Sequence, residues 1–285
     1  MRNIELKQIC KAIKNLCYKA NFSLPSDVVK KFREIYKEEK NKLTKKFINI
    51  LIENSKISKY KKIPLCQDTG IPFIFLDIGN EVKITGLKGY SLTQAINQSV
   101  KDAYKEYYLR QSLINDPLLR ENVRLTEPVV HYEFFKGKTI KIGLLIRGAG
   151  CENVTCLRMF SPSATLFEIK EFIVETVKQK LNYSCPPVTV GVGIGGDSTT
   201  AVLLSKKCFL RKFGVINKNN FYTKFEQDIF KEIRNSKTNI FGFNNKKDNS
   251  KILNVFIEHK SCHLASLPVA VSLQCNSYRR CNCII

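Results

Sequence analysis

The stretch Pro64-Leu65-Cys66-Gln67-Asp68-Thr69-Gly70 places a thiol, an amide, a carboxylate and a hydroxyl at four consecutive positions. A predominantly apolar run follows at residues 71–78, and Gly79-Asn80 ends it. A short apolar run bounded by turn residues predicts a buried strand. Rigid scaffolds commonly present binding and catalytic side chains in such a turn beside a core strand. The turn is therefore the first candidate site, and the strand is the first element of a predicted sheet.

Two later turns have the same character. Ser184-Cys185-Pro186-Pro187 precedes an apolar run at residues 188–194, and Leu273-Gln274-Cys275-Asn276 follows one at residues 268–273. The three cysteines are separated by 119 residues (185 − 66) and 90 residues (275 − 185), which matches no zinc motif, since zinc sites use closely spaced ligand pairs. Single cysteines from distant turns can instead supply three thiolates to an iron–sulfur cluster, with one iron open to a ligand. The spacing alone does not establish that the three cysteines bind a cluster.

Composition indicates a globular protein, with 44% apolar residues over 285 positions. No run of about 18 apolar residues and no secretory signal is visible, so we expect a cytoplasmic protein that does not span a membrane. Its 11 cysteines are odd in number and irregularly spaced, which argues against a disulfide framework. The formal charge of +22 is spread along the chain, which favours a compositional bias. A basic nucleic-acid-binding module is kept as the alternative of another class.

The predicted fold class is α/β, with mixed sheets flanked by helices and an N-terminal helical portion. Apolar residues at helical spacing predict helices in residues 1–60, and residues 61–285 predict alternating strands and helices. We expect the two portions to form a single domain over residues 1–285. Ser91 and Gln94 match a capping box, ahead of a helix that we expect to end near Arg110.

Several connections are also predicted. Residues 129–135 and 139–146 predict a hairpin around Lys136-Gly137-Lys138. A polar loop is expected at residues 244–250, and a loose tail around Cys281 and Cys283.

Two glycine clusters follow predicted strands. Gly148-Ala149-Gly150-Cys151-Glu152-Asn153 predicts either a close approach of backbone amides to a ligand or a tight connection. Gly191, Gly193 and Gly196 match the dinucleotide pattern G-x-G-x-x-G, with Asp197 as a helix cap. That pattern also needs an acidic residue about 20 positions later for the ribose, and none occurs between Asp197 and Glu226. We interpret the second cluster as a glycine-rich strand end that does not bind NAD.

Several motifs together resemble class I fumarate hydratase, a family that includes L-tartrate dehydratase. They occur in family order over nearly the whole chain: Cys66-Gln67-Asp68-Thr69-Gly70, Cys185-Pro186-Pro187, the glycines at 191–196, His263-Leu264-Ala265-Ser266-Leu267-Pro268-Val269-Ala270, and Cys275. The resemblance implies that Cys66, Cys185 and Cys275 hold a 4Fe–4S cluster whose fourth iron binds a hydroxy acid.

The resemblance also implies substrate contacts at Gln67, Asp68, Arg110, Gly150 and His263, with Asp68 and His263 as acid–base residues. These roles fit hydration of a dicarboxylic alkene, which needs proton transfer and partners for two carboxylates. From the residues alone, the favoured interpretation of Arg110 is a surface arginine that closes a helix. His263 could be an ordinary core histidine, and Asp68 a turn cap.

Single-chain members of this family continue into a second domain with further basic residues, whereas this sequence ends ten residues after Cys275. The resemblance therefore implies the alpha subunit of a hetero-oligomeric hydro-lyase that needs a beta subunit. We expect reversible hydration of fumarate to L-malate, a reaction of the tricarboxylic acid cycle, with L-tartrate dehydration as the nearest alternative. Cys281 and Cys283 have no place in the family pattern.

Overall fold

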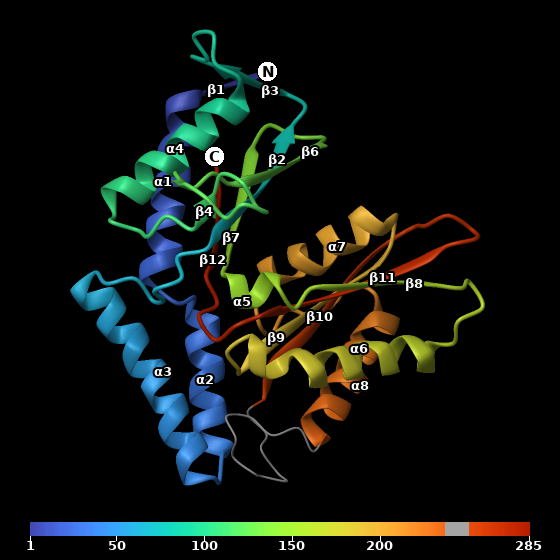
Figure 1. The fold of residues 1–285 in the computed structure, drawn as a ribbon. Helices are drawn as coiled ribbons and strands as arrows, with labels where there is room; N and C mark the ends of the chain where they lie inside the picture. The colour runs from blue at the N-terminus through green and yellow to red at the C-terminus, as the bar shows by residue number, and fades with distance from the viewer. Residues whose placement is uncertain (237–250) are drawn as a thin grey trace. The chain divides into compact units, whose positions relative to one another are not determined.

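The computed structural model describes residues 1–236 and 251–285 (Figure 1). The polar loop that the sequence predicts at residues 244–250 lies outside the described residues. Among the described residues, no helix is both long and apolar enough to cross a membrane.

The chain divides into two compact units, each with its own four-stranded mixed sheet. Unit 1 consists of Met1–Pro25, Asn54–Gly148 and Arg279–Ile285. Unit 2 consists of Ser26–Glu53 and Ala149–Tyr278. The mixed sheets, their flanking helices and the helices of the first 60 residues confirm the predicted α/β class. The single domain over residues 1–285 stays a prediction.

The sheet of unit 1 has the strand order β12-β7-β2-β6 (Figure 1). Strand β2 pairs in parallel with β6 and antiparallel with β7, and β12 pairs antiparallel with β7. The apolar run predicted as a buried strand is therefore the second strand from the edge, with neighbours on both sides. The strands are β2 (Ile71–Gly79), β6 (Val129–Phe135), β7 (Ile140–Arg147) and β12 (Arg280–Ile284).

The predicted hairpin of residues 129–135 and 139–146 is wrong. Both strands exist, but β2 lies between them and pairs with each. The end of β2 packs against the turn that joins them, because a Cβ on Gly79 would lie 2.3 Å from the Gly137 carbonyl oxygen. The physical reason is the apolar character of β2, which gains burial and two ladders of hydrogen bonds by inserting between the strands.

The loose tail predicted around Cys281 and Cys283 is also wrong. These residues lie in β12, which runs along β7 and aligns Cys281 with Leu144 and Cys283 with Ile142. The side chain of Cys281 is buried in the core of unit 1, where apolar contacts hold the strand to its neighbours.

Two helices cover the sheet of unit 1, α1 (Leu6–Phe22) and α4 (Leu92–Glu106). Their apolar faces form one core with alternate residues of β2 and β7. The predicted capping box is confirmed, since Ser91 Oγ accepts the Gln94 N–H at 3.1 Å and Gln94 Oε1 accepts the Ser91 N–H at 2.8 Å. The remaining strands of this unit are short: β1 (Arg2–Glu5) pairs with β3 (Val82–Thr85), and β4 (Leu113–Ile114) pairs with β5 (Val123–Arg124).

The sheet of unit 2 has the order β10-β9-β11-β8. Alternate residues of β9 (Val188–Gly195) face opposite ways. Its valines join a core with helices α6 (Leu166–Lys180) and α8 (Asn220–Asn235), while Gly191 and Gly193 meet α7 (Ser198–Lys207). The other strands are β8 (Cys156–Phe160), β10 (Ile252–Lys260) and β11 (Leu267–Gln274).

The remaining helical elements are short or lie near the N-terminus. Unit 2 also contains α2 (Ser26–Glu38), α5 (Ala149–Glu152) and the 3-10 turns η1 (Leu181–Tyr183) and η2 (Cys208–Leu210). Helix α3 (Lys42–Lys61) contributes residues to both units.

Candidate functional site

Residues 66–70, here called the site loop, have no regular secondary structure and lead directly into β2. Their backbone is held by a buried tyrosine, because the Tyr104 hydroxyl of α4 donates to the Thr69 carbonyl at 2.9 Å and reaches the Gly70 carbonyl at 3.3 Å. Burial raises the pKa of Tyr104, so this hydroxyl stays protonated and able to donate. Within the loop, Asp68 Oδ1 accepts the Gly70 N–H at 3.0 Å, as in other aspartate turns.

A second buried side chain holds the same loop. Arg279, just before β12, donates from Nη1 to the Asp68 carbonyl at 2.7 Å and to Asn21 Oδ1 at 3.4 Å. Sequence reasoning missed both Arg279 and Tyr104. Tyr104 looks like any apolar-face residue of a helix, and the only signal for Arg279 was its position four residues after Cys275.

Two glycines let the site loop lie directly on the end of β7. Gly70 has a φ of +65°, and a Cβ there would lie 2.3 Å from the Arg147 carbonyl oxygen. A Cβ on Gly148 would lie 2.4 Å from Asp68 Oδ2. Any side chain at position 148 would therefore collide with the Asp68 carboxylate in its present position.

Gln67 and Arg110 are the other two substrate-contact residues that the sequence predicts in unit 1, and both have exposed side chains. Gln67 lies in the site loop itself. Arg110 follows α4, which ends at Glu106, and its carbonyl accepts the Thr69 hydroxyl at 2.5 Å. The backbone of Arg110 is therefore tied to the site loop, and its guanidinium faces solvent.

In unit 2, the structure joins the loops of Cys185 and Cys275. The Asn276 N–H donates to the Cys185 carbonyl at 3.1 Å, and Asn276 Nδ2 donates to the Pro186 carbonyl at 2.9 Å. The Cys275 N–H points to the sulfur of buried Cys151 at 3.3 Å. Two cysteine turns that are 90 residues apart in sequence (275 − 185) therefore lie side by side, whereas Cys66 belongs to unit 1.

Gly150 and His263 also belong to unit 2. A Cβ on Gly150 would lie 2.9 Å from the Tyr183 carbonyl oxygen, so a glycine permits close contact with the segment that leads to Cys185. The sequence left two interpretations of this glycine cluster, a tight connection and a close approach to a ligand. This contact supports the tight connection. His263 lies exposed in the turn between β10 and β11, where its Nδ1 accepts the Ala265 N–H at 3.1 Å. It is not the core histidine that the residues alone also suggested.

The cysteines fall into two kinds. Cys17, Cys208 and Cys281 are buried, and burial raises the pKa of each thiol, that of Cys17 to about 12. A thiol with a raised pKa is a poor metal ligand, because the thiolate is the form that binds. Cys66 and Cys275 are partly exposed and Cys185 is exposed. These three thiols are therefore accessible to an iron–sulfur cluster, a property that they share with Cys10, Cys156, Cys262 and Cys283. Within the described ranges, no group of three or more His, Cys, Asp or Glu side chains forms a metal site.

The glycine pattern at residues 191–196 is explained by packing. A Cβ on Gly193 would lie 1.9 Å from the Ala201 carbonyl oxygen, and one on Gly191 would lie 2.2 Å from the Ser205 carbonyl oxygen. Helix α7 therefore lies directly against β9. Asp197 caps this helix, since its Oδ1 accepts the Thr200 N–H at 2.6 Å.

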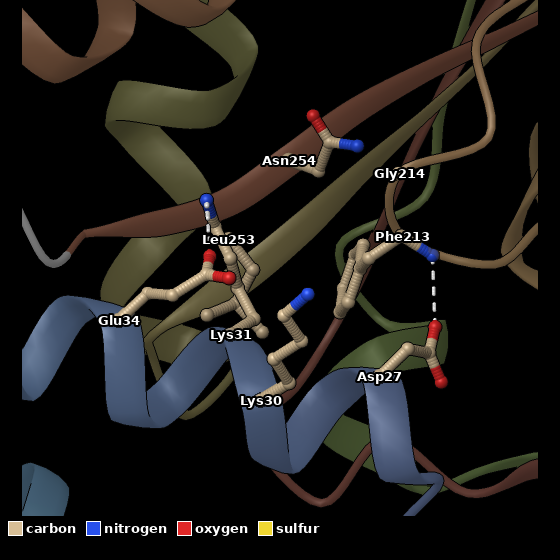
Figure 2. Close-up of a pocket in the computed structure, with 8 residues that line it drawn as sticks. All are labelled: Asp27, Lys30, Lys31, Glu34, Phe213, Gly214, Leu253 and Asn254. Carbon is tan, nitrogen blue, oxygen red and sulfur yellow. Dashed lines mark hydrogen bonds and ion pairs between the residues drawn. The ribbon is translucent and has the colours of Figure 1, made fainter.

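Unit 2 also has a cavity of about 330 Å³ between α2, the start of β10 and the segment at Phe213-Gly214 (Figure 2). Lys31 faces Glu34 at 3.7 Å, and Asp27 accepts the Phe213 N–H at 2.8 Å (Figure 2). The residues that line this cavity include none of the predicted site residues.

Comparison with known proteins identifies the class. A family model described as fumarate hydratase (fumerase) matches residues 10–284. The chain is 35% identical over 279 residues to the protein of Methanocaldococcus jannaschii named "Putative L(+)-tartrate dehydratase subunit alpha", with 96% of each chain covered. It is 24% identical over 279 residues to the L(+)-tartrate dehydratase subunit alpha of Escherichia coli K12, which covers 96% of this chain and 90% of that relative.

These matches define a hydro-lyase. The chain belongs to the fumarate hydratase (fumerase) family.

Proposed function

We propose that this chain is the alpha subunit of an iron–sulfur hydro-lyase that removes water from a four-carbon 2-hydroxydicarboxylic acid. The observation that carries the proposal is the 35% identity to a tartrate dehydratase alpha chain over 96% of both proteins. The names of the relatives favour L(+)-tartrate as the substrate over L-malate. The description of the family favours the second candidate, reversible hydration of fumarate.

A 4Fe–4S cluster would be held by Cys66, Cys185 and Cys275. When bound, it would supply a Lewis acid, since three protein thiolates leave one iron open. The donor set supports the proposal because these thiols lie outside the core, and the loops of Cys185 and Cys275 are bonded to each other.

Dehydration removes a proton from one carbon and a hydroxyl group from the next, so the site needs proton-transferring groups and partners for two carboxylates. Asp68 and His263 are the proposed acid–base residues. Asp68 is partly exposed beside the buried backbone of Thr69 and Gly70, so a substrate can reach a side chain whose main chain is fixed. The exposed guanidinium of Arg110 suits a carboxylate, and the Gln67 amide and Gly150 N–H are further proposed donors.

We infer that a beta subunit completes the enzyme. The relatives are named as alpha subunits, and Arg110 is the only one of the five proposed substrate-contact residues with a permanent positive charge. A substrate with two carboxylates needs more positive charge than that. The resulting enzyme is a hetero-oligomer in which the beta subunit supplies the remaining substrate contacts.

The test is anaerobic co-expression with the candidate beta subunit, followed by assays on L(+)-tartrate, L-malate and fumarate. We expect the largest kcat/KM with L(+)-tartrate and no turnover by the isolated chain. A larger value with L-malate would support the second candidate. Full turnover by the isolated chain would contradict the subunit role.

A binding assay addresses the nucleic-acid alternative. Tight binding to duplex DNA, falling steeply between about 50 and 200 mM salt, would favour a basic module over the enzyme. We expect weak binding, because the family match accounts for nearly the whole chain.

A further inference from the structure

Arg279 is a buried cation whose presence stability does not explain. It is 1% exposed, and its guanidinium stays protonated in proteins. Its Nε and Nη2 have no hydrogen-bond partner in the described part of the chain. A buried charge with two unmet donors costs free energy, and an apolar residue of similar size commonly makes a protein equally or more stable. The residue therefore calls for another role.

Within the described residues, the shortest hydrogen bond of the Arg279 side chain leads to the site loop. Its Nη1 donates to the Asp68 carbonyl at 2.7 Å, next to the Thr69 carbonyl that Tyr104 holds at 2.9 Å. Consecutive carbonyls of a segment without regular secondary structure are thus fixed by two side chains of unit 1, one from α4 and one from the residue that precedes β12.

Arg279 also lies close to the carboxylate of Asp68. A Cβ on Gly148 would be 2.4 Å from Asp68 Oδ2 and 3.6 Å from Arg279 Nη2, so both groups border the same glycine. The guanidinium bonds the main chain of Asp68 while its positive charge lies near the side chain. Arg279 can therefore influence both the place and the orientation of this carboxylate.

We propose that Arg279 is the positioning residue of the site loop, which fixes Asp68 for proton transfer and Cys66 beside it. The inference rests on the proposed function, because that function gives Asp68 and Cys66 their roles. Arg279 acts through these residues and does not itself contact the substrate.

The first test compares three variants of the assembled enzyme. Arg279→Met should lower kcat about a hundredfold, because a displacement of about 1 Å can cost that much, while KM stays close to wild type. Arg279→Lys keeps the charge without the planar fork and should recover part of the rate. Tyr278→Phe is the matched control: it removes a buried hydrogen bond at 2.9 Å to the Phe209 carbonyl, inside unit 2, and should leave kcat unchanged.

The second test uses the metal-free chain and needs no activity. The alkylation rate of Cys66 is compared with that of Cys185 by mass spectrometry of the peptides. Arg279→Met should speed the reaction of Cys66 roughly tenfold and leave that of Cys185 unchanged, because loss of one buried bond frees the site loop alone. The thermal unfolding midpoint should stay close to that of wild type, because the lost hydrogen bond and the removed cost of a buried charge act in opposite directions.

The outcomes separate the two proposals. A wild-type enzyme without turnover on any hydroxy acid would contradict the proposed function, while faster alkylation of Cys66 in Arg279→Met would still support the positioning role. Wild-type kcat and an unchanged Cys66 rate in Arg279→Met would overturn the inference. If Arg279→Met fails to fold, Arg279→Lys decides: lowered kcat with an intact cluster spectrum supports it, and wild-type kcat overturns it.

Discussion

The site loop of unit 1 and the glycine-rich strand β9 of unit 2 are both short motifs at a strand end, but different neighbours surround them. In β9, the carbonyls of Ala201 and Ser205 occupy the space that a side chain on Gly193 or Gly191 would need. Around the site loop, the Arg147 carbonyl packs against Gly70 in the same way, but the loop also meets two buried donors, the guanidinium of Arg279 and the hydroxyl of Tyr104.

The difference separates packing from function. Close contact between α7 and β9 accounts for Gly191 and Gly193, so these glycines need no ligand. Packing does not account for a buried arginine with unmet donors beside the aspartate of a loop that also carries a partly exposed thiol. Buried polar groups that stability does not require are the stronger pointer to a site.

The largest effect is expected from the thiol of the site loop. Cys66→Ser should abolish the iron–sulfur absorbance and all turnover, because a hydroxyl replaces a soft thiolate poorly. Cys10→Ser is the control, since Cys10 is partly buried beside α4 and should leave the absorbance intact. A full cluster and normal activity in Cys66→Ser would show that the loop does not bind the cluster.

Next in size is the carboxylate. Asp68→Asn keeps the shape but cannot exchange a proton near neutral pH, so kcat should fall about 10²- to 10⁴-fold with the cluster spectrum unchanged. His263→Asn should do the same if this exposed histidine transfers a proton. Steady-state kinetics with an iron determination on the same samples measures both. Near-normal rates would show that these residues shape turns and do not transfer protons.

A glycine of β9 should affect stability and leave chemistry alone. Gly193→Ala places a methyl group 1.9 Å from the Ala201 carbonyl oxygen, so overpacking should lower the free energy of unfolding by about 3 kcal/mol. The folded fraction should keep its kcat. Denaturant titration with activity per folded molecule checks this. A loss of kcat at wild-type stability would show that β9 acts in catalysis and not only in packing.

The smallest effect is expected at the cap of α7. Hydrogen bonds from Thr200 lower the pKa of Asp197, so the stabilisation is present above the ordinary aspartate pKa and is lost as pH falls through the folded value. Asp197→Ala should lower the thermal midpoint by only about 2 °C at neutral pH. The difference should begin to shrink near the ordinary aspartate pKa of about 3.9 and vanish once the pH is below the lowered pKa of the folded protein. If the difference in thermal midpoint between wild type and Asp197→Ala grew as the pH fell, the lowered pKa of Asp197 would be contradicted.

Local chemistry made much of the fold predictable. Ser91 and Asp197 cap the helices that follow them, and the polar turn at Cys66 lies at the start of a buried strand, as expected. The order of β6, β2 and β7 was not predictable from local patterns. The same turn can join two strands that pair with each other or two strands that have a third strand between them. Only tertiary burial of β2 separates them.

The candidate site was predictable only where a side chain carries its own chemistry. The family resemblance groups Cys185 and Cys275 with Cys66 as cluster ligands, a role that stays a prediction. The structure bonds the loops of Cys185 and Cys275 to each other. Arg279 was missed because a buried arginine and a surface arginine have the same local sequence pattern. The roles of Gln67, Asp68, Arg110, Gly150 and His263, and the cytoplasmic location, stay predictions.

The way unit 1 is assembled from separate chain segments bears on how the protein is made. Arg279–Ile285 complete unit 1, yet the ribosome produces them 131 residues after Gly148 (279 − 148). At ordinary rates of synthesis that interval lasts roughly 7–26 s. During it, the nascent chain already carries Cys66, but the arginine that fastens the loop beside it has not been translated. Newly made chains thus pass through a period in which this thiol is loosely held, and oxidative damage or metal insertion would meet its most open form then.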